Sequence, residues 1–375
     1  MQPVKVGVIG CGAICHQYFK HANLYSLLDM AACADMMPDK AREVAAQYNV
    51  PRVLSVDELL ADPDIEVVLN LTIPKAHAPI ALQAIEHGKH HYAEKPFGVT
   101  RDEGKAILKA AKKRRVRTGC APDTFFGAGH QTARRLIDDG AIGQPLVATA
   151  FMMGRGHESW HPNPEFYYQP GGGPMLDMGP YYLTALVNML GPISAVNGMT
   201  SIAIPTRTIT HGDGKGGHGP KYGQKIHVET PDHVTGCIQF KSGAIGTIIT
   251  SFATAHSVHD GKHPITIHGS EGTLRVPDPN GFDGTVLLRK LADPDWQEIA
   301  PTHTTGLGRA VGLADLAKAI RTKRPHRASG ELAYNVLDAM IGFLDSGQSG
   351  KRIKTADKYS RPAALPPGLP LGEMD

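Results

Sequence analysis

The stretch "GVIGCGAIC", Gly7 to Cys15, decides the fold of this 375-residue chain. Gly10, Gly12 and Cys15 occupy the three positions of a G-x-G-x-x-G motif, between a run typical of a strand and one typical of a helix. Gly10 permits a tight turn, Gly12 lets the backbone approach a pyrophosphate, and the helix N-terminus offers free N–H groups. Cys15 stands where the motif has its third glycine, and its side chain is small enough for the close helix–strand packing that this position needs. A glycine turn in an unrelated doubly wound protein is the alternative.

A carboxylate follows twenty residues after Cys15, in "CAD" at positions 33–35. Asp35 would end the second strand, where a carboxylate accepts hydrogen bonds from the adenosine ribose and repels a 2′-phosphate. Met36 follows it, and no arginine is adjacent. These two residues favour NAD as the cofactor, with NADP as the alternative.

Apolar runs alternate with helical patterns on both sides of this motif as far as residue 122. The strands are expected at "VKVGVIG", "MAACAD", "EVVLNLTI", "HHYAEKP" and "VRTGCAPD", and the intervening helices at "AREVAAQYN", "HAPIALQAIEHG" and "DEGKAILKAAKKRR". Strands separated by helices imply right-handed crossovers and a parallel sheet covered on both faces. Residues 1–122 are therefore predicted to form an α/β domain, a Rossmann doubly wound parallel sheet.

The pattern changes after residue 122. A helix at "GHQTARRLIDDG" precedes strands at "PLVATAFMMG", "HVTGCIQF", "GAIGTIITSF" and "PITIHG", and two late helices are expected at "AVGLADLAKAIRTK" and "GELAYNVLDAMIGFLDSG". Residues 123–351 are predicted to form an α+β domain with an open, mainly antiparallel sheet that binds substrate. The Gly-rich stretch "HGDGKGGHGPKYGQK" is expected to be a loop. The Pro-rich residues 352–375 should form a tail on the surface or on a neighbouring subunit.

Composition excludes several classes of protein. Thirty-nine basic and thirty-six acidic residues give a net charge of +3, and "KKRR" at 112–115 is the longest run of like charge, so nucleic acid is not an expected partner. Five cysteines without a C-x-x-C pair argue against a disulfide framework or a zinc ribbon. The chain has no apolar segment of membrane-spanning length and no signal-peptide pattern. We expect a soluble cytoplasmic protein with no membrane partner.

A second chemical signal is "AEKP", Glu94 to Pro96, at the end of the fourth predicted strand. Ligands of parallel sheets bind beyond the carboxyl ends of the strands, so Lys95 should point toward the nicotinamide end of the cofactor. A lysine there can stabilise an alkoxide, and Pro96 restricts its backbone. On its own, the Glu94–Lys95 pair would more often be a solvated surface pair.

These motifs, with "TIPKAH" at 72–77 and "GGGPMLDMGPYY" at 171–182, resemble the Gfo/Idh/MocA oxidoreductases over nearly the whole chain. The resemblance implies NAD(P)-dependent redox chemistry on sugars, cyclitols and related polyols. The cofactor contacts that the motifs and the resemblance together indicate are Gly10, Gly12, Ala13, Ile14, Asp35, Met36, Thr72, Pro74, His77, Glu94 and Lys95.

Many members of that family read D-x-G-x-H-x-x-D where this chain has Asp177, Gly179, Tyr181 and Thr184. Some members use a tyrosine in place of the histidine, so the resemblance makes Tyr181 the proton donor or acceptor, assisted by Lys95 and Asp177. A phenol is a ready acid at neutral pH and needs a nearby cation to become a base. The Gly179-Pro180 step predicts that a helix begins at Pro180 and leaves Asp177 in the preceding turn.

Nineteen histidines raise the question of a metal, notably His157 and His161 in "HESWH" and the group His256, His259 and His263. Their segments are broken by Gly and Pro and show no zinc spacing, so no metal site is expected. Trp160 and His161 are predicted to line a polyol pocket instead, with Asp123 and Thr124 as further substrate-binding candidates.

Three function classes remain: a sugar or cyclitol dehydrogenase or reductase, a redox-neutral NAD-dependent glycosidase or lyase that uses transient oxidation, and a non-catalytic dinucleotide sensor. The combination of Lys95 and Tyr181 disfavours the sensor. Alternation in "HVTGCIQF" and "AIGTIITSF" suggests that one face of the C-terminal sheet is uncovered, which predicts a homodimer or homotetramer.

Overall fold

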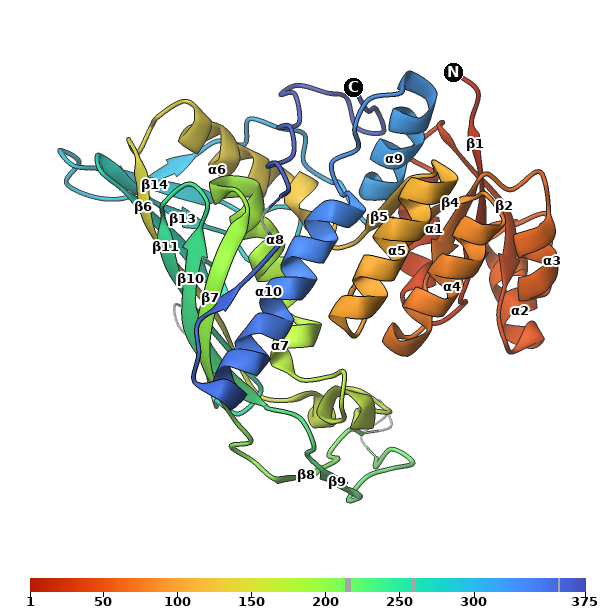
Figure 1. Ribbon diagram of the computed structural model, residues 1–375, viewed down its shortest axis with the longest axis horizontal. Helices are drawn as coiled ribbons and strands as arrows, with labels where there is room; N and C mark the ends of the chain where they lie inside the picture. Colours follow the sequence, from red (N-terminus) through yellow and green to blue (C-terminus); the bar gives the residue numbers. More distant parts are fainter. Residues whose placement is uncertain (213–216, 258–260, 357) are drawn as a thin grey trace.

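Two large sheets with helices packed between them make up the computed structural model, which describes residues 1–212, 217–257, 261–356 and 358–375 (Figure 1). The N-terminal sheet is parallel throughout, in the strand order β2-β1-β3-β4-β5. Its strands are β1 (Val4–Ile9), β2 (Leu28–Ala34), β3 (Val67–Asn70), β4 (His90–Ala93) and β5 (Thr118–Cys120). All five had been predicted from their apolar runs.

Helices connect these strands, and the two faces of the sheet enter separate hydrophobic clusters. The helices are α1 (Cys15–Ala22), α2 (Pro38–Tyr48), α3 (Val56–Ala61), α4 (Pro74–Glu86) and α5 (Arg101–Arg114). Val8 of β1 packs in the cluster that contains Tyr18 of α1, whereas its neighbour Ile9 packs with Leu59 and Leu60 of α3. Alternate side chains of one strand therefore face opposite layers, which confirms the predicted doubly wound domain.

The C-terminal sheet has nine strands in the order β15-β14-β13-β12-β6-β11-β10-β7-β16. Every pair is antiparallel except β11 with β6, which confirms the predicted mainly antiparallel sheet. Its strands are β6 (Pro145–Met153), β7 (Ile193–Ser201), β10 (His233–Phe240), β11 (Ile245–Ser251), β12 (Ile265–Gly269), β13 (Gly272–Val276), β14 (Val286–Lys290), β15 (Gln297–Ile299) and β16 (Ile353–Lys354).

A separate two-stranded sheet pairs β8 (Thr206–Thr208) with β9 (Lys225–His227). The predicted Gly-rich loop, residues 211–225, lies between these two strands except for Lys225, which begins β9. Residues 213–216 of that loop lie outside the described residues.

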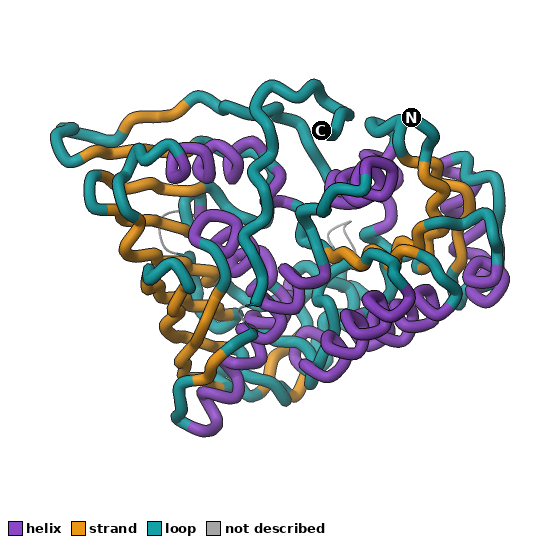
Figure 2. The backbone as a smooth tube through the Cα atoms, turned by 45° about the horizontal axis from the view of Figure 1, so that its top comes forward, coloured by secondary structure: helices purple, strands orange, loops and turns teal. Residues whose placement is uncertain are grey.

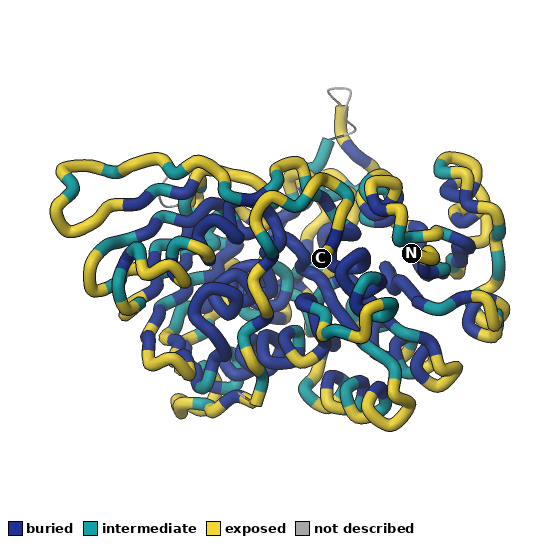
Figure 3. Tube along the Cα trace, turned by 90° about the horizontal axis from the view of Figure 1, so that it is seen from above, coloured by how far each residue is buried: buried dark blue, intermediate teal, exposed yellow. Residues whose placement is uncertain are grey.

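Helices fill the space between the two sheets (Figure 2). They are α6 (Ala128–Asp138), α7 (Pro174–Asp177), α8 (Gly179–Leu190), α9 (Val311–Thr322) and α10 (Gly330–Ser349). Helix α10 contacts β7 of the C-terminal sheet as well as α5 and β5 of the N-terminal domain. Seen from above, buried residues lie mainly toward the centre of the molecule, and exposed residues follow the outer loops (Figure 3).

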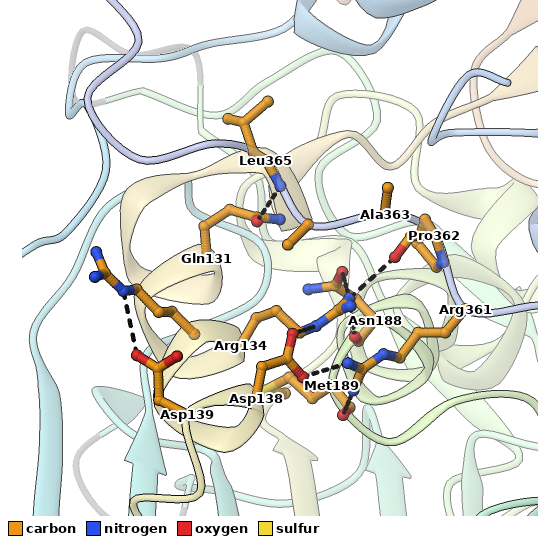
Figure 4. Close-up of polar contacts among 12 residues, drawn as sticks. Gln131, Arg134, Asp138, Asp139, Asn188, Met189, Arg361, Pro362, Ala363 and Leu365 are labelled. Atoms are coloured by element: carbon orange, nitrogen blue, oxygen red, sulfur yellow. Dashed lines mark hydrogen bonds and ion pairs between the residues drawn. The ribbon is translucent and has the colours of Figure 1, made fainter. Parts of the chain in front are cut away.

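The Pro-rich tail lies against its own chain, across α6 and α8 (Figure 4). The Leu365 N–H donates to Gln131 Oε1 at 2.9 Å, and Arg134 Nη1 donates to the carbonyl of Pro362 at 3.2 Å. Leu365 and Met374 are buried. The tail therefore packs on its own chain, and a contact with a neighbouring subunit stays a prediction.

Among the described residues, no helix is both long and apolar enough to cross a membrane. All five cysteines are free thiols, and only Cys237 is exposed.

Candidate active site

A cavity of about 270 Å³ lies where the carboxyl ends of the N-terminal strands meet the C-terminal domain. It brings together seven of the residues predicted from sequence and six that were not. The predicted residues are Ile14, Thr72, Pro74, Glu94, Lys95, Asp177 and Tyr181, and the additional ones are Pro96, Phe166, Tyr167, Gly171, Gly172 and Leu176.

The glycine loop beside this cavity has the geometry that a dinucleotide needs. Gly10 has φ +103°, and a Cβ there would lie 2.7 Å from the carbonyl carbon of Leu71, so only glycine fits. A Cβ on Gly12 would meet nothing within 4 Å, which leaves open space over the loop. Among the described residues, the N–H groups of Gly12, Ala13 and Ile14 donate no hydrogen bond. The loop can therefore hold the pyrophosphate of NAD at the start of α1.

Asp35 lies at the carboxyl end of β2 and is tied to the same loop. Its Oδ2 accepts a hydrogen bond from the Cys11 N–H at 2.7 Å, and its Oδ1 accepts one from the Met37 N–H at 2.8 Å. The carboxylate is partly exposed and keeps further acceptor positions for a ribose hydroxyl. Met36 points outward, with 94% of its surface exposed.

The second predicted cofactor loop is held together by Asn70 and His77. The Thr72 hydroxyl donates to Asn70 Oδ1 at 2.7 Å, and Asn70 Nδ2 donates to the carbonyl of His77 at 3.1 Å. The ring nitrogens of His77 lie 2.7 Å from the Pro96 carbonyl and 3.0 Å from the Thr72 carbonyl. His77 is buried and does not line the cavity. It fixes the Thr72 and Pro96 loops to each other, and its predicted contact with the cofactor stays a prediction.

Glu94 is a buried acceptor beneath the site. Tyr18 donates its hydroxyl to Glu94 Oε1 at 2.9 Å, and the Lys95 N–H donates to Glu94 Oε2 at 3.0 Å. Glu94 is 7% exposed, so the alternative of a solvated Glu94–Lys95 surface pair is wrong. These two hydrogen bonds fix the backbone that carries Lys95.

Lys95, Asp177 and His157 form a linked triad at the wall of the cavity. Lys95 Nζ lies 2.7 Å from Asp177 Oδ1 and also donates to the Asp177 carbonyl at 2.8 Å. His157 Nε2 donates to the other carboxylate oxygen, Asp177 Oδ2, at 3.0 Å. Burial opposes ionisation of Asp177, but Lys95 and His157 outweigh it and lower the pKa of this carboxyl group to about 2. Burial likewise opposes the charge of Lys95, yet Asp177 and Tyr181 raise the pKa of its ammonium group.

Tyr181 lies between two cations. Lys95 Nζ is 5.3 Å from the centre of its ring, and Arg309 Nη2 donates to the Tyr181 hydroxyl at 3.0 Å. Arg309 is held in turn by Asp123, at 3.2 Å, and Asp123 also accepts the Gly312 N–H. Burial raises the pKa of Tyr181, and the two cations offset part of that rise. The phenol is therefore protonated at neutral pH.

The backbone before Tyr181 differs from the prediction. Asp177 ends a short helix, α7, and α8 begins at Gly179, so Asp177 does not lie in a turn. Gly173 starts α7 with φ +87°, and a Cβ there would lie 2.8 Å from the Pro231 carbonyl. This glycine lets the chain enter α7 so that the Asp177 carboxylate faces Lys95.

Four predicted substrate residues do not line the cavity. Trp160 is 57% exposed, and His161 packs edge-on against Tyr167, which does line the cavity. Asp123 and Thr124 are buried, and Asp123 acts on the site through Arg309.

Sequence reasoning missed two residues that contact the predicted catalytic groups, His157 and Arg309. His157 was considered only as a metal ligand, although it lies 20 positions from Asp177. Arg309 is separated from Tyr181 by 128 positions and precedes α9 as an isolated arginine. Among the described residues, no three His, Cys, Asp or Glu side chains converge as a metal site, and His259 lies outside the described residues.

Comparison with known families accounts for this arrangement. Residues 4–121 match the oxidoreductase family with an NAD-binding Rossmann fold, and residues 130–275 match the GFO/IDH/MocA C-terminal domain. Together the matches cover more than two thirds of the chain. The chain belongs to the Gfo/Idh/MocA family. Its N-terminal domain is the NAD-binding domain of that family.

Similar proteins with known activities support the same assignment. Levoglucosan dehydrogenase of Pseudarthrobacter phenanthrenivorans is 29% identical over 301 residues, 73% of each chain. The 1,5-anhydro-D-fructose reductase of Ensifer adhaerens is 26% identical and covers 92% of this chain and 96% of its own. A solved structure of levoglucosan dehydrogenase in complex with NADH and L-sorbose shares the fold, with a TM-score of 0.78 at 23% identity over 95% of this chain and all of that one. This member of the Gfo/Idh/MocA family is thus an NAD-binding oxidoreductase.

Proposed function

We propose that the protein transfers a hydride between NAD and a hydroxyl or keto carbon of a sugar, cyclitol or related polyol. The observation that carries the proposal is the position of Lys95 and Tyr181, which line one cavity with the cofactor-loop residues Ile14, Thr72 and Pro74. Relatives named for levoglucosan, 1,5-anhydro-D-fructose and inositol support a polyol substrate. NAD, when bound, accepts or supplies the hydride.

Tyr181 is the proposed acid/base. Its protonated phenol donates to the carbonyl oxygen in reduction, and its phenolate takes the hydroxyl proton in oxidation. Arg309 holds the phenol oxygen at 3.0 Å and stabilises the negative charge that forms on it in the oxidative direction.

Lys95 is proposed to bind the reacting oxygen and stabilise its alkoxide character. Asp177 keeps the ammonium group charged and oriented through the 2.7 Å contact. His157 occupies the remaining carboxylate oxygen and prevents Asp177 from rotating away. His157 acts on Lys95 only through Asp177, so His157 is a positioning residue in this mechanism.

A panel of sugars, cyclitols and their keto forms, assayed at 340 nm with NAD and with NADP, tests the proposal. A substrate that produces a net change in absorbance supports the dehydrogenase or reductase. Turnover of a glycoside without any net change at 340 nm would support the redox-neutral glycosidase or lyase instead.

We also propose a homodimer or homotetramer built on the open face of the C-terminal sheet. Met199, Ile245 and Val147 are 75%, 58% and 45% exposed, and Ile245 of β11 is in register with Val147 of β6. An apolar strip of this kind favours a symmetric partner. A monomer at micromolar concentration in analytical ultracentrifugation would contradict this assembly.

The five free cysteines support a reducing compartment such as the cytoplasm.

A further inference from the structure

A second cavity, of about 950 Å³, lies at the amino end of β5, away from the catalytic cavity at the carboxyl ends of the strands. Three segments enclose it: the end of α5 with the turn into β5 (108–118), the connection from α9 to α10 (323–331), and the tail (358–363 with Asp375). The volume is within the range of small-molecule sites. The proposed redox reaction gives this cavity no role.

The walls of this second cavity are strongly basic. Seven Lys or Arg residues line it against two carboxylates, Glu331 and Asp375. The seven are Lys112, Arg117, Lys323, Arg324, Arg327, Lys358 and Arg361. Because the whole chain has a net charge of only +3, this concentration of cations is a local feature.

Three of the seven cations are neutralised by the fold and make the walls rigid. Arg327 Nη1 lies 2.6 Å from Asp315 Oδ1, and Arg327 Nη2 lies 2.7 Å from Asp375 Oδ2. Arg324 also pairs with Asp315, at 2.7 Å. Arg361 pairs with Asp138 of α6 and donates to the Met189 carbonyl at 2.7 Å (Figure 4). These contacts hold the tail wall against the rest of the chain.

The other four cations, Lys112, Arg117, Lys323 and Lys358, have no side-chain hydrogen bond or ion pair among the described residues. Arg117 is only partly exposed. Burial first and the like charge of Arg324 second lower the pKa of its guanidinium group. Like charges around one cavity repel one another, and an anion placed among them would relieve that repulsion. Of the two lining carboxylates, Glu331 would oppose such an anion, whereas Asp375 is already paired with Arg327.

Polar and apolar groups beside these cations suit a small molecule. Leu108, Val116 and Pro325 supply apolar surface. The Tyr359 hydroxyl in the tail wall is buried without a hydrogen-bond partner among the described residues. We infer that this cavity binds a small anion that carries at least two phosphate groups.

Titration of the NADH-saturated full chain with inorganic pyrophosphate, by isothermal calorimetry at constant ionic strength, tests the inference. Saturating NADH keeps pyrophosphate away from the glycine loop. The wild type should bind one pyrophosphate per chain. The double variant R117A/K323A, which removes two unpaired cations from different walls, should bind at least about tenfold more weakly.

The matched control is K113A/R114A, which removes the same charge from exposed residues of α5 that do not line the cavity. It should bind as the wild type does. Absence of binding by the wild type, or equal weakening of both double variants, would overturn the inference, because the second result indicates general surface attraction. Circular dichroism melting checks the fold, and R117Q/K323Q replaces the alanine variant if that one unfolds.

Discussion

The proposed site has two halves. The cofactor half, the glycine loop beside the cavity, is built mainly from backbone, whereas the substrate half, at the cavity wall, is built from charged side chains. In the cofactor half, the open space over Gly12 and the hydrogen bonds of the Asp35 carboxylate to Cys11 and Met37 shape the loop. In the substrate half, Asp177 joins Lys95 to His157.

The difference between the halves predicts how each responds to substitution. Backbone geometry in the cofactor half depends on single local residues, so a change there should affect NAD binding alone. The substrate half is a network of buried charges, in which Lys95–Asp177–His157 and Tyr181–Arg309–Asp123 meet around one phenol. Substitutions there should reduce turnover and leave NAD affinity almost unchanged.

Tyr181→Phe should have the largest effect. Removal of the hydroxyl removes the proton path, and general acid/base help is typically worth about a hundredfold to ten-thousandfold in rate. Turnover of the identified substrate should fall by that factor, while NADH affinity measured by fluorescence titration stays within about twofold.

The neighbouring residue provides the control for that variant. Tyr182 is also buried on α8 but does not line the cavity, so Tyr182→Phe should be much milder. If Tyr181→Phe kept wild-type turnover, the proton donor would be another residue. The expected difference between the cofactor half and the substrate half would then be contradicted.

The pH dependence of alcohol oxidation should show the next largest effect. Because burial raises the pKa of Tyr181 above its ordinary value of about 10, the phenolate fraction rises about tenfold per pH unit through the neutral range. The kcat/KM for oxidation should therefore increase about a hundredfold from pH 7 to pH 9, whereas carbonyl reduction should be nearly flat. A profile for oxidation that levels off below pH 8 would assign the base to another group.

The sequence predicted the fold best where a pattern is local. All five parallel strands were found from apolar runs, and so were β6, β10, β11 and β12. Strand β7 was missed because its sequence, "ISAVNGMTS", has no clear alternation, and α10 is what buries its inner face. Strands β13 to β15, at one end of the sheet, were also missed, because they are short and their sequences show no clear alternation of apolar and polar residues. The boundary at residue 122 stays a prediction.

Within the site, too, local sequence patterns could be predicted and contacts that depend on tertiary packing could not. The glycine motif, Asp35 and the Glu94–Lys95 pair could be found because strand ends converge at one edge of a parallel sheet. Tyr181 and Asp177 came from a family resemblance. Arg309 could not be found by either route, because its contact with Asp123 spans 186 positions and depends on how the two sheets pack.

Cofactor preference tests the cofactor half. A 2′-phosphate on the ribose would meet the Asp35 carboxylate with no arginine beside it, so NAD should bind at least about tenfold more tightly than NADP in fluorescence titrations. Asp35→Asn should reduce the ratio of NAD affinity to NADP affinity. It should also weaken NAD binding, since an amide offers only one acceptor oxygen to the two N–H groups of Cys11 and Met37. A clear preference of the wild type for NADP would remove Asp35 from the ribose site.

His157 gives the sharpest test of the network of buried charges, with an effect expected to stay below that of Tyr181→Phe. His157→Phe keeps a ring among Tyr167 and Phe252 but removes the donor to Asp177. A hydrogen bond to a charged group is worth about 1.5–3 kcal/mol, so turnover should fall by about tenfold to a hundredfold with NAD affinity unchanged. His157→Gln, which retains a donor, should recover part of the loss. The Lys95–Asp177 ion pair remains in both variants, which is why the loss should stay below that of Tyr181→Phe. If His157→Phe lost as much turnover as Tyr181→Phe, His157 itself would be the residue that exchanges the proton. The imidazole of His157, rather than the phenol of Tyr181, would then face the substrate.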